Sequence, residues 1–256
     1  MADTRYYTIP KGRLWFKKAN DTSYIDLGNL SELKISVETE MVEHFSSRGP
    51  NKVKDWEHLN SFRSKWSGML EELNVDNLKL FLVSDSTETI TQTGATVAAE
   101  AHADVEPGRG YKLAYHTIEN AVPSTVAVKK GLTTYTEGSD YEIDYTEGIL
   151  YIKPGGTIAS GDDITIDYTS EDVTGYTQIN GNSRTNYEGD FLFVGNPGAG
   201  QQLTIKGYVS FQPTGDLPLL SDELVKLSVQ GEFLSGHGYG KNNGGEFEVV
   251  ARGYVS

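Results

Sequence analysis

The sequence predicts a mainly β protein: a β-sandwich or barrel with one short helix, into which a small all-β domain is inserted. The first observation is that apolar and polar side chains alternate with a period of two over residues 33–45. The second is a series of five short strand-like segments in the middle third, separated by turns that contain glycine. The third is the composition, because the 256 residues include 28 glycines and 15 tyrosines. Glycine favours turns, whereas tyrosine favours strands.

The alternating segment is expected to be a long, half-buried strand. The apolar side chains lie at odd-numbered positions, which we call the apolar parity: Leu33, Ile35, Val37, Met41 and Phe45. Its other parity is polar apart from Val42 and includes Lys34, Ser36, Glu38, Glu40 and His44. At about 3.3 Å per residue, this strand would span roughly 43 Å. Residues 14–16 precede a predicted turn at residues 26–29, and we expect them to pair with the long strand.

The chain after the long strand is expected to form a loop and then a second strand. Residues 46–51 are rich in turn-forming residue types and end the first strand. Residues 51–60 are polar and basic, which predicts an exposed loop. Residues 62–70 alternate again and predict the second strand.

A short helix is expected next, because Asn74 can cap it and Leu78, Phe81 and Leu82 share one helical face. Residues 84–100 are rich in serine, threonine and alanine. This stretch predicts a linker or a loose strand.

The middle segment differs from its surroundings in charge. Residues 1–83 carry 12 acidic and 12 basic side chains, whereas residues 99–176 carry 14 acidic and 5 basic ones, a net charge of −9. The five strand-like segments lie at residues 111–115, 125–128, 141–145, 149–152 and 164–168. Short strands at this spacing predict a small sandwich. We therefore divide the chain into a first part (1–100), an inserted acidic domain (101–175) and a second part (176–256).

The last part of the chain returns to longer alternating segments. Strands are predicted at residues 191–194, 203–211, 225–233 and 247–251. The sequence GNPGAG at residues 195–200 predicts a hairpin loop. It lacks the Gly-Lys-Ser/Thr of a phosphate-binding loop, because Gln201 and Gln202 follow Gly200. Ser221–Leu224 predicts one helical turn capped by Ser221.

Composition and motifs argue against catalysis, metal binding and tight binding of nucleic acid. The chain has no cysteine, which excludes disulfides and thiolate chemistry. Its net charge of −14 disfavours tight binding to nucleic acid. The five histidines show no metal-binding or catalytic spacing. Asp140, Glu142 and Asp144 share a strand face where carboxylates can hold calcium, but acids also alternate on ordinary solvated strands. The sequence thus predicts no catalytic, cofactor-binding or metal site.

The distribution of apolar residues predicts where in the cell the chain folds. No segment reaches the roughly 18 consecutive apolar residues of a membrane span. The N-terminal residues lack the apolar core of a secretory signal. We therefore expect the chain to fold in a cytoplasm.

Several stretches resemble a known family. They are KGRL at residues 11–14, IDLGNLSEL at 25–33 and ETEMVEHFSSRG at 38–49. Near the end the resemblance continues through residues 189–191, 195–196, Pro213, 219–227 and 231–234. Residues 10–85 and 180–256 together resemble the major tail tube proteins of long-tailed, siphovirus-like bacteriophages. The middle segment resembles a β-domain that such tail proteins often carry.

The resemblance implies a fold and a structural role in the virion tail. Subunits of such tubes form rings, usually hexameric, and the rings stack into a conduit for DNA ejection. Long strands build an inner barrel, a short helix packs outside it, and an insert faces away from the lumen. The implied partners are the chain itself and other tail proteins: the tape measure, the tail terminator and the baseplate or tip. DNA passes without specific binding, no cofactor or catalytic activity is implied, and assembly takes place in the host cytoplasm.

Within this scheme the two parities of the long strand receive different roles. The apolar side chains of Leu33, Ile35, Val37 and Met41 are expected to face the subunit core. The opposite side chains, Lys34, Ser36, Glu38 and Glu40, are then expected to face the lumen, where carboxylates would repel DNA phosphates.

Two other functions stay open. The chain resembles equally the tube subunit of a contractile tail or injection machine. A carbohydrate-binding β-sandwich is the alternative from a different class, with sugars stacking on tyrosines of the middle segment: Tyr135, Tyr141, Tyr145, Tyr151 and Tyr168. A β-rich hydrolase lacks any recognisable site.

Overall fold

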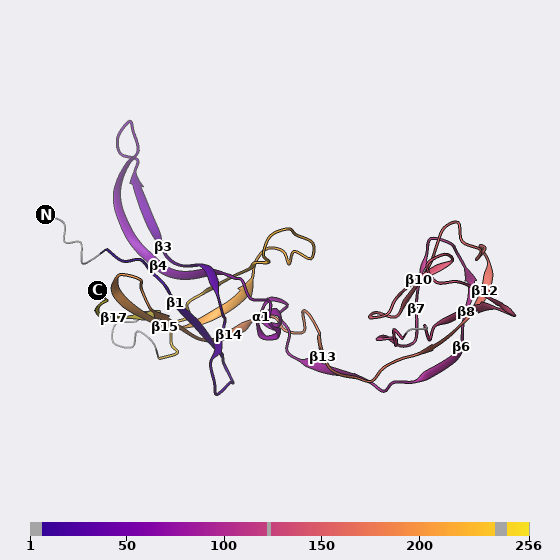
Figure 1. Ribbon diagram of the computed structural model, residues 1–256. Helices are drawn as coiled ribbons and strands as arrows, with labels where there is room; N and C mark the ends of the chain where they lie inside the picture. Colours follow the sequence, from indigo (N-terminus) through magenta and orange to yellow (C-terminus); the bar gives the residue numbers. More distant parts are fainter. Residues whose placement is uncertain (1–6, 122–123, 239–244, 256) are drawn as a thin grey trace. The chain divides into compact units, whose positions relative to one another are not determined.

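The computed structural model describes residues 7–121, 124–238 and 245–255 (Figure 1). The described residues form 17 strands and one helix, so the mainly β prediction is confirmed. The chain divides into two compact units. Unit 1 consists of residues 1–87 and 179–256, and unit 2 of residues 88–178. Unit 2 is wider on both sides than the insert predicted at 101–175.

Unit 1 is built on one eight-stranded antiparallel sheet. Its strand order is β2-β1-β14-β15-β16-β4-β3, and β17 also pairs with β15. The bounds are β1 (Gly12–Lys18), β2 (Ile25–Asp26), β3 (Leu30–Ser46), β4 (Val53–Leu70), β14 (Tyr187–Gly195), β15 (Gly200–Pro213), β16 (Leu227–Glu232) and β17 (Phe247–Val255). β1 pairs with β14 and β2. The expectation that residues 14–16 pair with the long strand is therefore wrong, because strand pairing depends on contacts distant in the sequence.

The core of unit 1 shows that this sheet curls over on itself. The ring of Trp66 on β4 lies 5.4 Å from that of Phe191 on β14, although two strands separate β4 from β14 in the sheet. In a flat sheet three strand spacings would hold them roughly 14 Å apart. Phe211 lies 5.2 Å from both Trp66 and Phe16. The inner face of the curled sheet thus encloses one aromatic cluster.

The predicted helix is present as α1 (Val75–Phe81). Asn74 caps it, because its side-chain oxygen accepts a hydrogen bond from the Asn77 amide at 2.8 Å. Leu80 and Phe81 are buried against the core of unit 1. The Asn77 side chain donates to the Leu27 carbonyl at 3.1 Å, which ties the helix to the chain just before β3.

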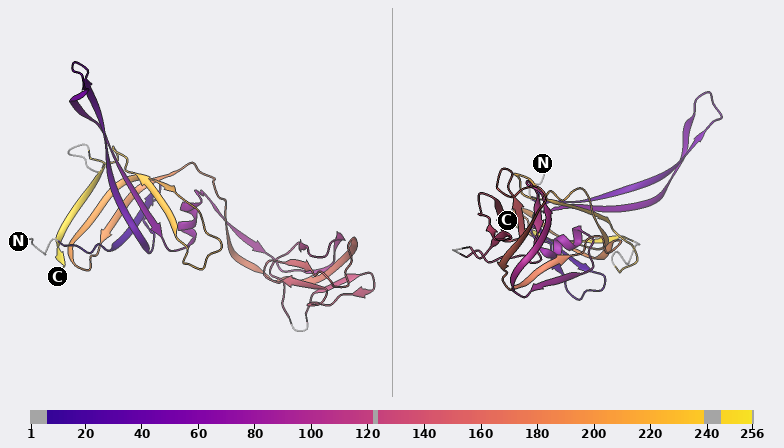
Figure 2. Two further views of the ribbon diagram at one scale, coloured as in Figure 1. Left: turned by 90° about the horizontal axis from the view of Figure 1, so that it is seen from above. Right: turned by 90° about the vertical axis from the view of Figure 1, so that its right-hand side faces the viewer.

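β3 and β4 extend beyond the core as a two-stranded ribbon, visible as the long purple hairpin in Figures 1 and 2. They pair along their whole length, from Leu30–Leu70 to Ser46–Val53. The loop predicted at residues 51–60 is therefore wrong. The pairing shifts between Glu40 and Met41 and again between His44 and Phe45. Each shift is a bulge with one extra residue on β4, and the bulges hide the period of two in that stretch.

Two further segments of unit 1 bear on the sequence predictions. β14 and β15 pair through the turn at residues 195–200, so the predicted hairpin loop is confirmed. Ser221–Leu224 is a bend, and the prediction of a helical turn there is wrong. Ser221 Oγ still accepts a hydrogen bond from the Glu223 amide at 3.0 Å.

Unit 2 contains two small sheets around its own core. One has the order β6-β12-β8-β9 and the other β10-β11-β7. The bounds are β6 (Thr96–Val105), β7 (Gly110–Lys112), β8 (Ala127–Lys130), β9 (Thr133–Thr134), β10 (Tyr141–Asp144), β11 (Ile149–Ile152) and β12 (Asp162–Thr169). Each of the five short strands predicted here overlaps an observed one. Buried side chains from both sheets form one cluster that includes Leu150, Ile152, Ile164 and Ile166.

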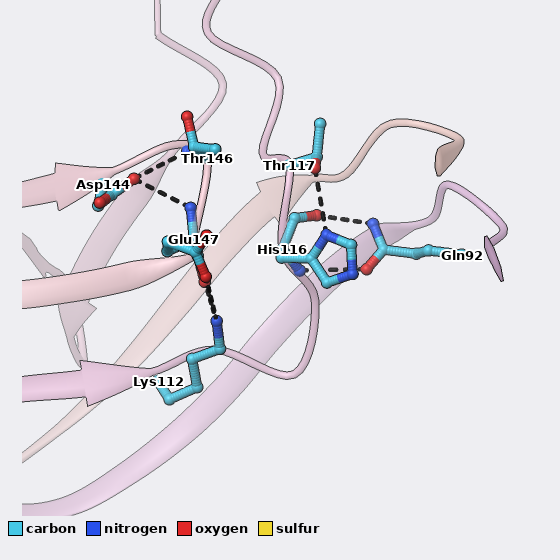
Figure 3. Close-up of polar contacts among 7 residues, drawn as sticks. All are labelled: Gln92, Lys112, His116, Thr117, Asp144, Thr146 and Glu147. Atoms are coloured by element: carbon cyan, nitrogen blue, oxygen red, sulfur yellow. Dashed lines mark hydrogen bonds and ion pairs between the residues drawn. The ribbon is translucent and has the colours of Figure 1, made fainter. Parts of the chain in front are cut away.

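The chain enters unit 2 on β5 (Thr87–Gln92) and leaves it on β13 (Val173–Ile179), and these two strands pair with each other. At the end of β5 the Gln92 amide holds the neighbouring loop (Figure 3). Its Nε2 donates to the His116 and Glu171 carbonyls at 2.6 and 3.1 Å, and its Oε1 accepts from the His116 amide at 3.1 Å. The side chain thus links β5 to the segments around His116 and Glu171. Residues 84–100, predicted as a linker or loose strand, are largely paired.

Removing residues 88–178 and joining the ends with a short Gly/Ser bridge is expected to leave unit 1 folded. The two hydrophobic clusters share no residue, and the paired strands β5 and β13 bring the ends of the excised segment together. Far-UV circular dichroism and thermal unfolding of the shortened chain measure this. A chain that no longer unfolds cooperatively would contradict the modular arrangement.

Unit 2 is expected to lose stability in acid through its buried carboxylates. The Thr136 and Thr157 amides and the Thr157 hydroxyl hydrogen-bond Asp140 and hold its pKa below the ordinary 3.8. A hydrogen bond from Lys130 likewise lowers the pKa of Asp162. Because these pKa values are depressed in the folded state, the stabilisation is complete above about pH 4 and disappears as pH falls through the lowered pKa.

Hydrogen exchange followed peptide by peptide between pH 5 and pH 2.5, with correction for the intrinsic exchange rate, measures this effect in the intact chain. Opening of unit 2 should increase steeply below pH 4. Asp140→Asn should reduce stability already at neutral pH and flatten the acid dependence. An exposed control, Asp163→Asn, should follow the wild type, and equal behaviour of the two variants would contradict the assignment.

Candidate assembly surface

The four residues predicted to face a lumen lie together on one face of β3. Lys34, Ser36, Glu38 and Glu40 are all exposed. Their cross-strand neighbours on β4 are Ser67, Lys65, Arg63 and Ser61, respectively. Directly opposed residues of an antiparallel pair point to the same side. We call these eight residues the polar face.

The polar face is not acidic, because its eight residues include three basic side chains, Lys34, Arg63 and Lys65, and two acidic ones, Glu38 and Glu40. Lys65 Nζ lies 2.7 Å from a Glu38 carboxylate oxygen, and the Ser61 hydroxyl donates to Glu40 at 3.0 Å. Lys34 forms an ion pair with Glu32. Arg63 lies directly opposite Glu38. The sequence predicts a surface on which Glu38 and Glu40 repel DNA. The pairing register of β3 with β4, which places Arg63 and Lys65 beside them, cannot be read from the sequence.

The polar face continues across two more strands. Ser67 pairs with Gln230 on β16, which in turn pairs with Gln212 on β15. A shallow concavity here is lined mainly by polar side chains, namely those of Ser36, Lys65, Ser67, Ser210, Gln212, Gln230 and Glu232. Sequence analysis missed Gln212 and Gln230. Gln230 alternates with the apolar residues of the strand predicted at 225–233, so its exposed side could be read from the sequence, whereas Gln212 lies one residue beyond the strand predicted at 203–211.

The expectation for the apolar parity of β3 holds only near the body of unit 1. Leu33 and Ile35 pack against the hydrophobic cluster. Val37 and Met41, predicted to face the same core, are 56% and 42% exposed, and the prediction is wrong for them. The reason is the ribbon: beyond residue 36 the two strands leave the body, and no sheet or helix of the described residues is layered over them.

We call residues 37–62 the ribbon. It carries seven exposed large apolar side chains, namely Val37, Met41, Val42, Phe45, Val53, Trp56 and Phe62. They occupy both faces, because Thr39–Phe62 and Met41–Leu59 point to one side while Val42–His58 and His44–Trp56 point to the other. A two-stranded hairpin is marginally stable alone in water, and a concentration of exposed apolar side chains marks an interaction surface.

The ribbon also has an open edge. β3 is the last strand of the sheet order and pairs only with β4 among the described residues. Alternate residues of this 17-residue strand therefore present backbone N–H and C=O groups toward the side on which no described strand lies. Such an edge can accept a further strand from another chain.

The residues considered for metal binding are used in local structure. Asp140 accepts hydrogen bonds from residues 136 and 157, Glu142 pairs with Lys153 at 2.8 Å, and Asp144 accepts from the amides of the following turn (Figure 3). Within residues 7–121, 124–238 and 245–255, no group of three or more metal-ligating side chains is arranged to hold an ion. His44 pairs with Asp55 at 2.5 Å, and His102 with Glu100 at 3.2 Å.

The chain belongs to a protein family described as "Protein of unknown function UCP028589", whose model matches residues 7–247. No curated protein matches the chain. In the described part of the chain, no helix is long and apolar enough to cross a membrane.

Proposed function

We propose that this member of the family is a structural protein that self-assembles into stacked rings and forms the tail tube of a long-tailed bacteriophage. The ribbon is the observation that carries the proposal. It extends the outer halves of the 17- and 18-residue strands β3 and β4 away from the core and exposes apolar side chains on both faces. Among the described residues, the edge of β3 and that of the outer half of β4 have no further strand beside them. Each of these features is costly for a monomer and is removed when a neighbouring copy covers the ribbon.

The curled sheet of unit 1 supports the role of a barrel-forming subunit. One of its faces holds the aromatic cluster, and the polar face lies on the other side of β3 and β4. A closed ring would join the open edges of neighbouring sheets, which is how barrels remove edge strands. The family resemblance of residues 10–85 and 180–256 falls almost entirely on this unit.

The polar face suits the wall of a conduit for DNA. Every unbalanced Lys or Arg that contacts a phosphate adds to affinity for DNA, and stacked rings would multiply the effect. Here Lys65 is paired with Glu38 and Lys34 with Glu32, and Arg63 lies directly opposite Glu38. Serine and glutamine side chains fill the area between them. Charge compensation thus takes the place of the acidic repulsion expected from Glu38 and Glu40.

The remaining parts of the proposal follow from the same assembly. The partners are further copies of the chain and the tape measure, tail terminator and baseplate or tip proteins. The site of action is the virion tail, after assembly in the host cytoplasm, and no catalytic activity, cofactor or metal is proposed. A contractile tail or injection machine would use the same subunit design.

The carbohydrate-binding alternative is not favoured by the side chains of unit 2. Tyr135, Tyr141 and Tyr168 are buried in its core. The Tyr145 hydroxyl donates a hydrogen bond to the Glu137 carboxylate, and Tyr151 is the exposed member of the set. Buried rings cannot stack on a sugar.

Electron microscopy of the purified full-length chain tests the proposal. Because ring formation depends on concentration, the sample is examined from micromolar to millimolar concentration, and its mass is followed by light scattering. Rings or tubes with a central channel are the expected result. A monodisperse monomer across the whole range, together with its absence from purified phage tails of the source, would refute the proposal.

A further inference from the structure

Two segments of unit 1 combine exposed apolar side chains with a net charge, which is positive in one segment and negative in the other. The first is the ribbon tip, defined as residues 45–54. Phe45 and Val53 are 48% and 62% exposed there. The tip contains Arg48, Lys52 and Lys54 and no acidic residue. Lys54 is paired with Glu43, whereas Arg48 and Lys52 form no ion pair with the described residues.

The second segment is the loop between β15 and β16, residues 214–226, which we call the leucine loop. Leu217 and Val225 pack against the core and hold the two ends of the loop. Between them Leu219, Leu220 and Leu224 are 83%, 97% and 81% exposed. The loop also carries Asp216, Asp222 and Glu223, for which the described part of the chain offers no ion pair, and Lys226 at its end, which lies 3.9 Å from Glu71.

The leucine loop is therefore anchored at both ends while its apolar side chains project into solvent. Hydrogen bonds shape it further: the Thr214 amide donates to the Ser228 carbonyl at 2.8 Å, and Ser221 Oγ accepts from the Glu223 amide. Three projecting leucines on a held loop are unusual for a surface that faces only water. A partner with an apolar and basic surface fits this loop.

The ribbon tip is such a surface, but it belongs to a different part of the same unit. In Figures 1 and 2 the purple tip and the yellow-orange loop between β15 and β16 lie apart in all three views. The stiff pairing of β3 with β4 continues to Ser46–Val53. The tip of one chain thus does not reach the leucine loop of that chain.

We propose that the ribbon tip of one copy docks on the leucine loop of a second copy. Phe45 and Val53 would cover Leu219, Leu220 and Leu224, while Arg48 and Lys52 lie against Asp222 and Glu223. The inference rests on the proposed self-assembly and names the contact through which copies are joined. Apolar burial supplies the affinity of such a contact, and the opposite charges set its orientation and speed of formation.

The contact has a direct consequence for assembly. It is heterologous, because the tip of one copy meets a different surface on the next, and two joined copies together keep one free tip and one free loop. Contacts of this type propagate instead of stopping at a dimer. The tip and loop are thus suited to join one ring to the next along a tube.

Cross-linking of two singly labelled proteins tests the contact in the full-length chain. The chain contains no cysteine, so Asn51→Cys and Ser221→Cys each introduce a unique thiol. Docking of the tip on the loop brings these two thiols together, so mixing the two proteins under mild oxidation is expected to give a disulfide-linked heterodimer. A disulfide forms only where the two Cα atoms come within about 7 Å, so the product reports a specific contact. The matched control replaces Ser221→Cys by Asn20→Cys, an exposed site in the turn between β1 and β2. Equal heterodimer yield in both mixtures would overturn the proposal.

Charge reversal supplies the second measurement. Arg48→Glu with Lys52→Glu in the Asn51→Cys protein should slow heterodimer formation by roughly tenfold, and so should Asp222→Lys with Glu223→Lys in the Ser221→Cys protein. Mixing the two reversed proteins should restore the rate. Failure of this rescue would refute the pairing of these charges.

The outcomes separate the inference from the proposed function. Rings or tubes without tip-to-loop cross-links would leave the tail tube proposal standing and overturn the inference. Specific cross-links between copies without any ring or tube would support the contact and contradict the tail tube proposal. Cross-linking of the leucine loop to another tail protein in preference to the tip would identify a different occupant and overturn the inference.

Discussion

Replacing Met41 and Phe62 by serine is expected to abolish assembly without unfolding the chain. Both side chains lie on the same face of the ribbon, and they are 42% and 57% exposed in the single chain. Burial of a Met or Phe side chain contributes about 1.5–3 kcal/mol. Because each side chain is about half exposed before assembly, loss of both contributions amounts to about 1.5–3 kcal/mol, which lowers the association constant of each contact by roughly ten- to a hundredfold.

Light scattering and electron microscopy at matched concentrations measure this loss. The thermal unfolding midpoint should change little, because neither side chain belongs to the core of unit 1. Leu132→Ser in unit 2 is the matched control, since Leu132 is fully exposed outside the ribbon. Normal rings from the Met41/Phe62 variant would show that this face of the ribbon is not an interface.

Trp66→Ala is expected to be the most damaging single substitution in unit 1. The Trp66 side chain is 2% exposed, contacts Phe191 and Phe211, and donates from Nε1 to the Ser210 carbonyl at 3.1 Å. Truncation of a buried Trp to Ala costs about 3–5 kcal/mol. Total stabilities lie at about 5–15 kcal/mol, so the variant should lose a large share of its free energy of unfolding.

Urea unfolding followed by far-UV circular dichroism gives the free energy of unfolding for the variant. Trp56→Ala is the control, because Trp56 is 52% exposed on the ribbon and should change the stability of the single chain by less than about 1 kcal/mol. Similar losses for the two variants would mean that the curled sheet does not depend on the contacts of Trp66.

Features that depend on neighbouring residues could be predicted from the sequence. The helix was predicted because Asn74 caps it from the adjacent position and because its apolar residues recur at helical spacing. β3 was predicted because apolar and polar side chains alternate over most of residues 33–45. The five short strands of unit 2 were found because glycine turns separate them.

Features that depend on distant residues could not be predicted. Nothing near residues 14–16 specifies β14 as their neighbour, and the balance of charge on the polar face depends on the register that sets Glu38 opposite Arg63. The first half of β4 was missed because Asp55 and Asn60 are extra residues that interrupt its period. Val37 and Met41 were assigned to the core because alternation predicts which side chains share a face, but not whether a second layer covers that face.

The bulge at Asn60 makes the direction of the ribbon independent of which side chains lie on each of its faces. Glu40 pairs with Ser61 and Met41 with Leu59, so Asn60 has no partner of its own. Deleting it would keep every cross-strand pair, and hence the set of side chains on each face, while removing the local bend and extra twist that a bulge adds. The angle at which the ribbon leaves the sheet can therefore change in evolution by one codon, without redesign of the surface that it carries.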